Sequence, residues 1–227
     1  MRAFAVAFVA ALAVVAATAP AGGATNECRG IQQCIRVPGP WVVVPPHGHA
    51  DYLLACPSGR GVVGGLDAQA TSRDVRVSFD GRLGSPVQPG QTTTRYAFFR
   101  AVSISRSTQA FQPLLGCIPV QGGGGRSTVS ARVVPVGQPL EYRSRIVVVG
   151  PGDVKFARVS CLATETLVGG WHAVAFRTKQ PPRLAHAGLV QASHQLLGRT
   201  VVVTASSTDA LSPDAHAIVQ GGAVCAP

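Results

Sequence analysis

A cysteine-centred segment that occurs twice constrains the fold of this chain more than any other feature. Residues 56–65 read CPSGRGVVGG and residues 161–170 read CLATETLVGG, so that the cysteine and the Gly-Gly pair coincide 105 residues apart. A Cys-x-Pro follows each copy, at Cys117 and at Cys225, where the offset is 108 residues. The period exceeds that of solenoid repeats, which predicts a duplication of one domain-sized unit.

The cysteines predict a disulfide framework that follows the repeat. Their even number lies behind an export signal, and six cysteines allow about fifteen pairings. The repeat favours one bridge in each copy and a third that closes a short N-terminal loop. We therefore expect the pairs Cys28–Cys34, Cys56–Cys117 and Cys161–Cys225.

The N-terminus is typical of a secretory signal peptide. Arg2 precedes an apolar run over residues 3–17, and small residues follow it up to Ala24. The apolar run is too short and too rich in alanine to favour a permanent membrane span. We expect cleavage after Ala24, no membrane span in the mature chain, and a secreted, extracellular protein that can associate with the cell wall.

Short β-branched and aromatic runs between Gly- and Pro-rich turns predict an all-β protein. About six or seven such runs fall within the first copy, a density typical of a β-sandwich. We expect two tandem homologous β-sandwich (Ig-like) units, each with one internal disulfide. The expected divisions are a signal peptide (1–24), an N-terminal segment with a small disulfide loop (25–40), repeat 1 (41–119), a Gly-rich linker (120–130) and repeat 2 (131–227).

Two segments are harder to assign. Residues 67–74 are polar and predict a loop between strands. Residues 183–198 carry small and aliphatic side chains at helical spacing, from Ala185 to Leu196, but Gly188 lies inside the segment. A helix and a non-helical segment both remain open there.

The charge balance favours anionic partners. The formal net charge is +10 and the pI about 10.2, with arginine far more frequent than lysine. A GC-rich genome alone can produce such a composition, but the excess also attracts anionic polysaccharide, cell-wall polymers and lipid head groups. The arginines form no basic run and do not alternate with stacking aromatics, which argues against sequence-specific binding of nucleic acid.

A resemblance adds to this interpretation. A cysteine, a short polar turn, two aliphatic residues and Gly-Gly, ending at a Cys-x-Pro, are carried here by residues 56–65, Gly84-Ser85-Pro86 and Cys117-Ile118-Pro119. The combination resembles uncharacterised secreted proteins of high-GC Gram-positive bacteria and extends over both copies. It implies a secreted β-rich protein and no particular activity. The second copy has Leu162 where the first has proline, so its turn is expected to differ.

Histidines provide the candidate metal ligands. His47, His49 and Asp51 alternate along one stretch, and alternate residues of an extended chain share a face, so they could hold one metal ion. The alternative is a solvated turn. His186 and His194 are eight residues apart, which is not the spacing of a helical zinc pair, so His172, His186 and His194 are expected to be structural.

No residue set specifies a reaction. The chain has no Gly-x-Ser-x-Gly elbow and no phosphate-binding loop, and every cysteine has an expected partner. No catalytic residue and no cofactor is predicted, and Trp41 and Trp171 are expected in the core. The leading hypothesis is a non-enzymatic protein that binds an anionic or glycan surface. The alternatives are a secreted hydrolase with a site on loops 69–73 or 88–94, and a structural component of the envelope.

Overall fold

The computed structural model of the protein describes residues 35–57, 61–80, 95–118 and 140–227. Within these ranges the N-terminal half forms seven strands: β1 (Ile35–Pro38), β2 (Trp41–Val44), β3 (His49–Ala55), β4 (Val62–Ala70), β5 (Val75–Asp80), β6 (Tyr96–Ser103) and β7 (Gln109–Ile118). The C-terminal half forms β8 (Glu141–Val148), β9 (Val154–Ser160), β10 (Thr166–Phe176), the short helix α1 (Leu184–Ala187), β11 (Val190–Leu197), β12 (Thr200–Ser207), a 3-10 turn η1 (Pro213–Ala215) and β13 (Ala217–Ala226). The expectation of a nearly all-β protein is confirmed.

One sheet is shared by the two halves. Its strand order is β1-β7-β2-β10-β13-β8, and β4 pairs with the free side of β7. Strand β2 makes the junction, because Val42 lies opposite Phe111 of β7 on one side and opposite Ala175 of β10 on the other. Two further sheets, β3-β6-β5 and β11-β12-β9, belong to one half each. The halves are therefore joined by backbone hydrogen bonds.

The strand orders of the two halves correspond. Strands β4, β7 and β2 are neighbours in the shared sheet in the same order as β10, β13 and β8, and β3-β6-β5 corresponds to β9-β12-β11. The bridges Cys56–Cys117 and Cys161–Cys225 are confirmed, and each links the residue after β3 or β9 to β7 or β13. The expected pair Cys28–Cys34 and the expected linker 120–130 lie outside the described residues.

The strand register aligns β4 with β10 one residue differently from the alignment of Cys56 with Cys161. Val63 lies opposite Cys117, Leu167 lies opposite Cys225, and a β-bulge follows each of these pairs. Residues at corresponding places in β4 and β10 are thus 104 positions apart rather than 105. The turn between the cysteine and the strand is one residue shorter in the second copy.

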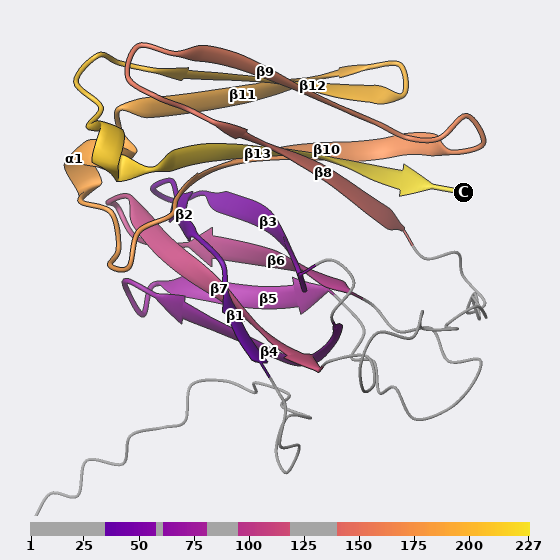
Figure 1. Ribbon diagram of the computed structural model, residues 1–227, viewed down its shortest axis with the longest axis horizontal. Coiled ribbons are helices and arrows are strands. Elements are labelled where there is room, and N and C mark those ends of the chain that lie inside the picture. The colour runs from indigo at the N-terminus through magenta and orange to yellow at the C-terminus, as the bar shows by residue number, and fades with distance from the viewer. Residues whose placement is uncertain (1–34, 58–60, 81–94, 119–139) are drawn as a thin grey trace, which may run out of the picture.

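The sheets stack in layers (Figure 1). The sheet β11-β12-β9 covers one face of β10-β13-β8, and the N-terminal half lies against the other face. Strand β13 is consequently buried along almost its whole length. Gly222 is required there, because a Cβ atom at this position would overlap the indole ring of Trp171.

Two hydrophobic cores flank this middle layer. The first lies inside the N-terminal half and contains Tyr52, Phe99, Phe111 and Leu115, with Ala173, Ala175 and Ile218 contributed by the C-terminal half. The second lies between β10-β13-β8 and β11-β12-β9 and contains Phe176, Val201, Val203 and Val219. In β12 the buried side chains alternate with less buried ones, as expected for a strand with one covered face.

The structure corrects the assignment of the segment 67–74. It is not a loop throughout, because β4 continues to Ala70 and pairs with β7 along that length. The polar side chains of this segment favoured a loop in the sequence, but backbone pairing with β7 makes its first part a strand.

The ambiguous segment 183–198 divides into two elements. It forms the four-residue helix α1 and then β11, with Gly188 between them. Of the expected N-terminal segment 25–40, the part that is described forms β1 and pairs with β7. No helix in the described part of the chain is long and apolar enough to cross a bilayer.

Candidate ligand-binding groove between the two halves

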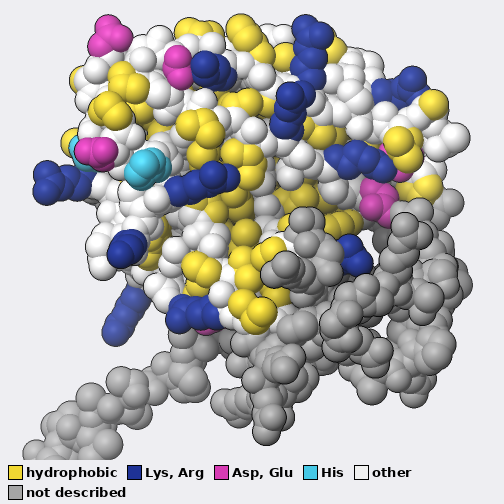
Figure 2. Space-filling view, viewed as in Figure 1, with side chains coloured by type: hydrophobic (Ala, Val, Ile, Leu, Met, Phe, Trp, Pro, Cys, Tyr) yellow, Lys and Arg dark blue, Asp and Glu magenta, His cyan; other side chains and the backbone are white. Residues whose placement is uncertain are grey.

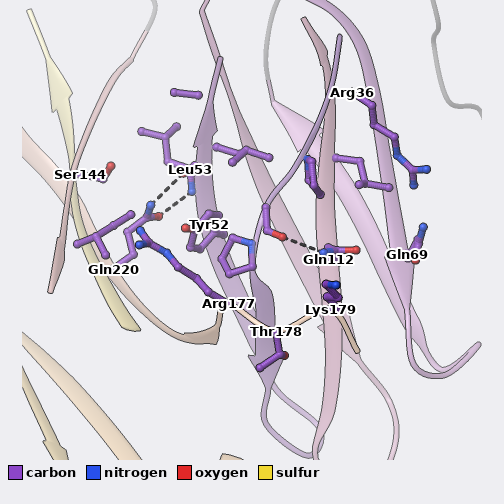
Figure 3. Close-up of a pocket in the computed structure, with 17 residues that line it drawn as sticks. Arg36, Tyr52, Leu53, Gln69, Gln112, Ser144, Arg177, Thr178, Lys179 and Gln220 are labelled. Carbon is purple, nitrogen blue, oxygen red and sulfur yellow. Dashed lines mark hydrogen bonds between the residues drawn. The ribbon is translucent and has the colours of Figure 1, made fainter. Parts of the chain in front are cut away.

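A large open groove lies where the two halves meet (Figure 3). Its volume is about 1030 Å³, and it receives side chains from β1, β3, β4, β7, β8 and β13 and from the segment after β10. The polar and charged residues that line it are Arg36, Tyr52, Gln69, Gln112, Ser144, Arg177, Thr178, Lys179 and Gln220. It is the larger of two cavities that we consider as sites.

The free edge of β3 is closed by a side chain from the other half. The Leu53 backbone N–H donates to Gln220 Oε1 over 2.8 Å, and Gln220 Nε2 donates to the Leu53 carbonyl over 2.9 Å. The carboxamide thereby replaces a neighbouring strand at this one residue (Figure 3). Gln220 is 1% exposed. It fixes one wall of the groove against the other, and both of its polar groups are satisfied within the protein.

Three cations face the groove without a counter-charge. Arg36, Arg177 and Lys179 are exposed, and none of them forms an ion pair with a described residue. No aspartate or glutamate is among the described residues that line the groove. The arrangement can attract an anionic ligand, because partly enclosed like charges reinforce one another's potential.

Tyr52 lines the same groove as these three cations. Its side chain is almost fully buried, and burial raises its pKa to about 12, while the positive charge of Arg177 acts in the opposite direction. Arg177 extends towards Tyr52 in Figure 3. The phenol is therefore neutral at physiological pH, and it leaves the positive charge of the groove unchanged.

Amide and hydroxyl groups add hydrogen-bonding capacity. Gln112 Nε2 donates to the Gly39 carbonyl over 2.9 Å, which orients its amide and leaves the Oε1 oxygen as an acceptor. Gln69 and Ser144 have no side-chain hydrogen bond to another described residue. Such groups can bind the hydroxyls of a sugar, whereas the cations bind its acidic substituents.

The basic side chains on the face drawn in Figure 2 are dispersed. Figure 2 shows Lys and Arg side chains spread around a central band of apolar ones, with the acidic groups towards the margins of the view. The absence of one dense basic patch agrees with the arginine spacing in the sequence. A shaped site such as the groove can supply selectivity for a particular anion that the dispersed charges of this face do not.

A second cavity of about 400 Å³ lies between β5 and β6 of one half and β8 and β10 of the other. The Asp51 carboxylate receives two hydrogen bonds from Arg100, at 2.8 and 2.7 Å, and Asp80 accepts one from Tyr142 at 2.6 Å. The bond to Asp51 raises the pKa of Arg100. Burial, followed by the bond to Asp80, raises the pKa of Tyr142. The charges of Asp51 and Arg100 compensate each other, and Asp80 is already hydrogen-bonded by Tyr142, which makes this cavity the weaker candidate.

The candidate metal ligands occupy different environments. His47 lies in a turn with φ 48°, His49 is exposed at the start of β3, and Asp51 is buried and engaged by Arg100. Among the described residues, one group of three possible ligands has its atoms within 4.8 Å of one another, namely Cys161, Glu165 and Cys225. Both of these cysteines are oxidised in a disulfide, so neither can supply a thiolate.

The two tryptophans and the two loop segments singled out in the sequence differ in their relation to the groove. Trp41 and Trp171 are 5% and 4% exposed, which confirms that both pack in the interior. Of the proposed hydrolase loops, residues 69–73 comprise the end of β4 and part of its connection to β5, and Gln69 lines the groove. Residues 88–94 lie outside the described residues. Sequence reasoning missed Arg177, Lys179 and Gln220, because isolated residues carry no motif that would bring them together.

Comparison of the chain with protein-family models, with curated proteins and with solved structures gives no match. The resemblance to secreted bacterial proteins therefore stays a prediction. Any functional conclusion must come from the groove itself.

Proposed function

We propose that this is a secreted, non-enzymatic protein that binds an anionic polysaccharide, such as a polymer of the cell surface, in the groove between its halves. The observation that carries the proposal is the set of Arg36, Arg177 and Lys179, which face one cavity of about 1030 Å³ without a lining carboxylate. Free amide and hydroxyl groups of the same groove suit the neutral part of a sugar chain. The overall charge of +10 would assist the encounter.

Export and duplication belong to the same proposal. Residues 1–24 would direct secretion, and two disulfides suit an oxidising compartment. The corresponding strand orders of the two halves support a duplication of one sandwich unit. In this account the groove is a product of the duplication, because it forms only where the two copies meet.

Binding to defined polymers tests the proposal. We would measure the affinity of the mature protein at low salt for a carboxylated polysaccharide, a phosphate-bearing polysaccharide and neutral dextran. The variant Arg36→Gln/Arg177→Gln/Lys179→Gln should lose about tenfold in affinity or more, if each exposed contact contributes about 0.5 kcal/mol. Dextran should bind weakly, and added salt should weaken the binding of both charged polymers.

A matched variant controls for net charge. Arg76, Arg106 and Arg158 are exposed and do not line the groove, so their replacement by glutamine removes the same charge elsewhere. This control should keep most of the affinity. Equal losses in the two triple variants, or equal binding of dextran, would contradict a groove-specific anion site.

A further inference from the structure

Two histidines that are far apart in the sequence meet where the two sheets of the C-terminal half contact each other. His172 on β10 and His194 on β11 place their Nδ1 atoms 2.7 Å apart, with ring centroids 5.0 Å apart and an interplanar angle of 53°. The two strands belong to different sheets and do not pair with each other. The contact therefore depends on how the two sheets pack, and the spacing of His172, His186 and His194 in the sequence could not reveal it.

The geometry allows one electrophile to bridge the two rings. At 2.7 Å the Nδ1 atoms can share one hydrogen, so at least one of them directs a lone pair towards the other. Neutral imidazole nitrogens bind transition metals at about 2.0–2.1 Å. Two nitrogens in neighbouring positions of a square-planar ion are then about 2.9 Å apart, and about 3.3 Å apart on a tetrahedral ion. The observed separation is closer to the square-planar value, and a small rotation of either ring would reach it.

The surroundings of His172 favour its neutral, metal-ligating form. Burial lowers the pKa of His172, and the neighbouring His194 and His49 lower it further. His49 comes from β3 of the N-terminal half, so the electrostatic influence on His172 includes a residue of the other half. No third histidine, cysteine or carboxylate of the described residues has its ligand atom within 4.8 Å of both. Water would complete the coordination.

We propose that His172 and His194 chelate a divalent transition-metal ion, and that Cu²⁺ fits best. Square-planar nitrogen coordination is typical of Cu²⁺, which also has the highest affinity of the common divalent ions for such ligands. The ion would connect β10 of the shared sheet to β11 of the outer sheet. The candidate of the sequence analysis, His47 with His49 and Asp51, is a different set, in which Asp51 is already held by Arg100.

A calorimetric titration with Cu²⁺ in a non-coordinating buffer tests this site. The intact mature protein should bind one ion that the variant His172→Gln/His194→Gln binds at least a hundredfold more weakly. The electron paramagnetic resonance spectrum of the wild-type complex should show coupling to two nitrogens. Bound Cu²⁺ should also raise the Tm of the wild type and leave that of the double variant unchanged.

The variant His186→Gln is the matched control, because His186 lies in α1 and has no ring contact with the pair. It should keep the wild-type affinity within about twofold, a difference of about 0.4 kcal/mol. Circular dichroism without metal establishes that each variant folds, and if the double variant does not fold, the single variants decide by the same criterion. Unchanged Cu²⁺ affinity after loss of either histidine would overturn the proposal.

Discussion

The outer faces of the two smaller sheets have opposite surroundings, although their strands have corresponding orders. In β3-β6-β5 this face is covered by the C-terminal half: Phe98 is 6% exposed, stacks on Tyr142 at 4.5 Å and meets the edge of Trp171 at 5.0 Å. In β11-β12-β9 the corresponding face is open, and Phe156 is 63% exposed. Two sheets with corresponding strand orders thus differ in how far their outer faces are buried.

The difference shows how the halves are stacked. The edge of β2 in the first half meets the edge of β10 in the second, and these strands are not counterparts of each other. Such a head-to-tail contact leaves one smaller sheet covered and the other open. The position of a sheet in the stack therefore decides whether its outer face is buried. A phenylalanine on the covered face contributes to the free energy of unfolding, and one on the open face contributes little.

The largest predicted effect tests whether the halves are equally dependent on their bridges. The disulfides close loops with sequence separations of 61 and 64 residues. In the chain-entropy model each should contribute about 4 kcal/mol to the free energy of unfolding. Denaturant titration of Cys56→Ala/Cys117→Ala and of Cys161→Ala/Cys225→Ala should give similar losses. A loss confined to one variant would show that one half carries the stability of the whole.

The second prediction contrasts the two outer faces. Phe98→Ala removes a ring from a buried aromatic cluster and should lower the free energy of unfolding by about 3 kcal/mol or more. Phe156→Ala removes a ring that is mostly in water and should change it by less than about 0.5 kcal/mol. Urea unfolding monitored by tryptophan fluorescence would measure both. Similar losses for the two variants would mean that the open face is covered in solution.

The sequence was sufficient for several of the strands and for two of the bridges. β-Branched runs, Gly/Pro turns and the duplicated cysteines are local signals, and they located β2, β3 and β12 and the pairs Cys56–Cys117 and Cys161–Cys225. The junction of β2 with β10 could not be inferred in this way. Edge strands of two separate sandwiches carry the same residues as strands in the middle of a joined sheet.

The third prediction compares two glutamines that lie opposite equivalent strands. Gln220 satisfies both backbone groups of Leu53, whereas Gln112 donates one bond to Gly39. Gln220→Leu leaves two backbone groups without a partner and should cost about 2 kcal/mol. Gln112→Leu leaves a single carbonyl that water can reach, and should cost about 0.5–1 kcal/mol. Thermal denaturation of both variants measures the difference, and equal costs would mean that Gln220 does not hold the halves together.

The groove was less predictable than the strands for a related reason. Arg36 and Arg177 are 141 residues apart in the chain and reach one cavity only because two halves pack against each other. The net charge predicted an anionic partner, but no local feature distinguished these two arginines from the others. A site formed between the two halves has no counterpart inside either half, so the repeated sequence segments could not indicate it.

The smallest predicted effect is a pH dependence of the stability that comes from the histidine pair of the C-terminal half. The folded-state pKa of His172 is lowered, first by burial and then by His194 and His49, so the unfolded chain binds the proton more readily. The stability that depends on neutral His172 is therefore present above the unfolded pKa of about 6.5. It decreases as the pH falls from that value through the lower folded pKa.

Thermal melting without metal between pH 7.5 and pH 5 measures this dependence. The wild type should lose more Tm over the acidic part of this range than His172→Gln, whose side chain does not titrate. His186→Gln provides the comparison, because that residue lies in the same half and is not part of the pair. Parallel Tm curves for the wild type and His172→Gln would mean that His172 is exposed to water. That result would contradict the packing of β10 against β11 on which the histidine contact depends.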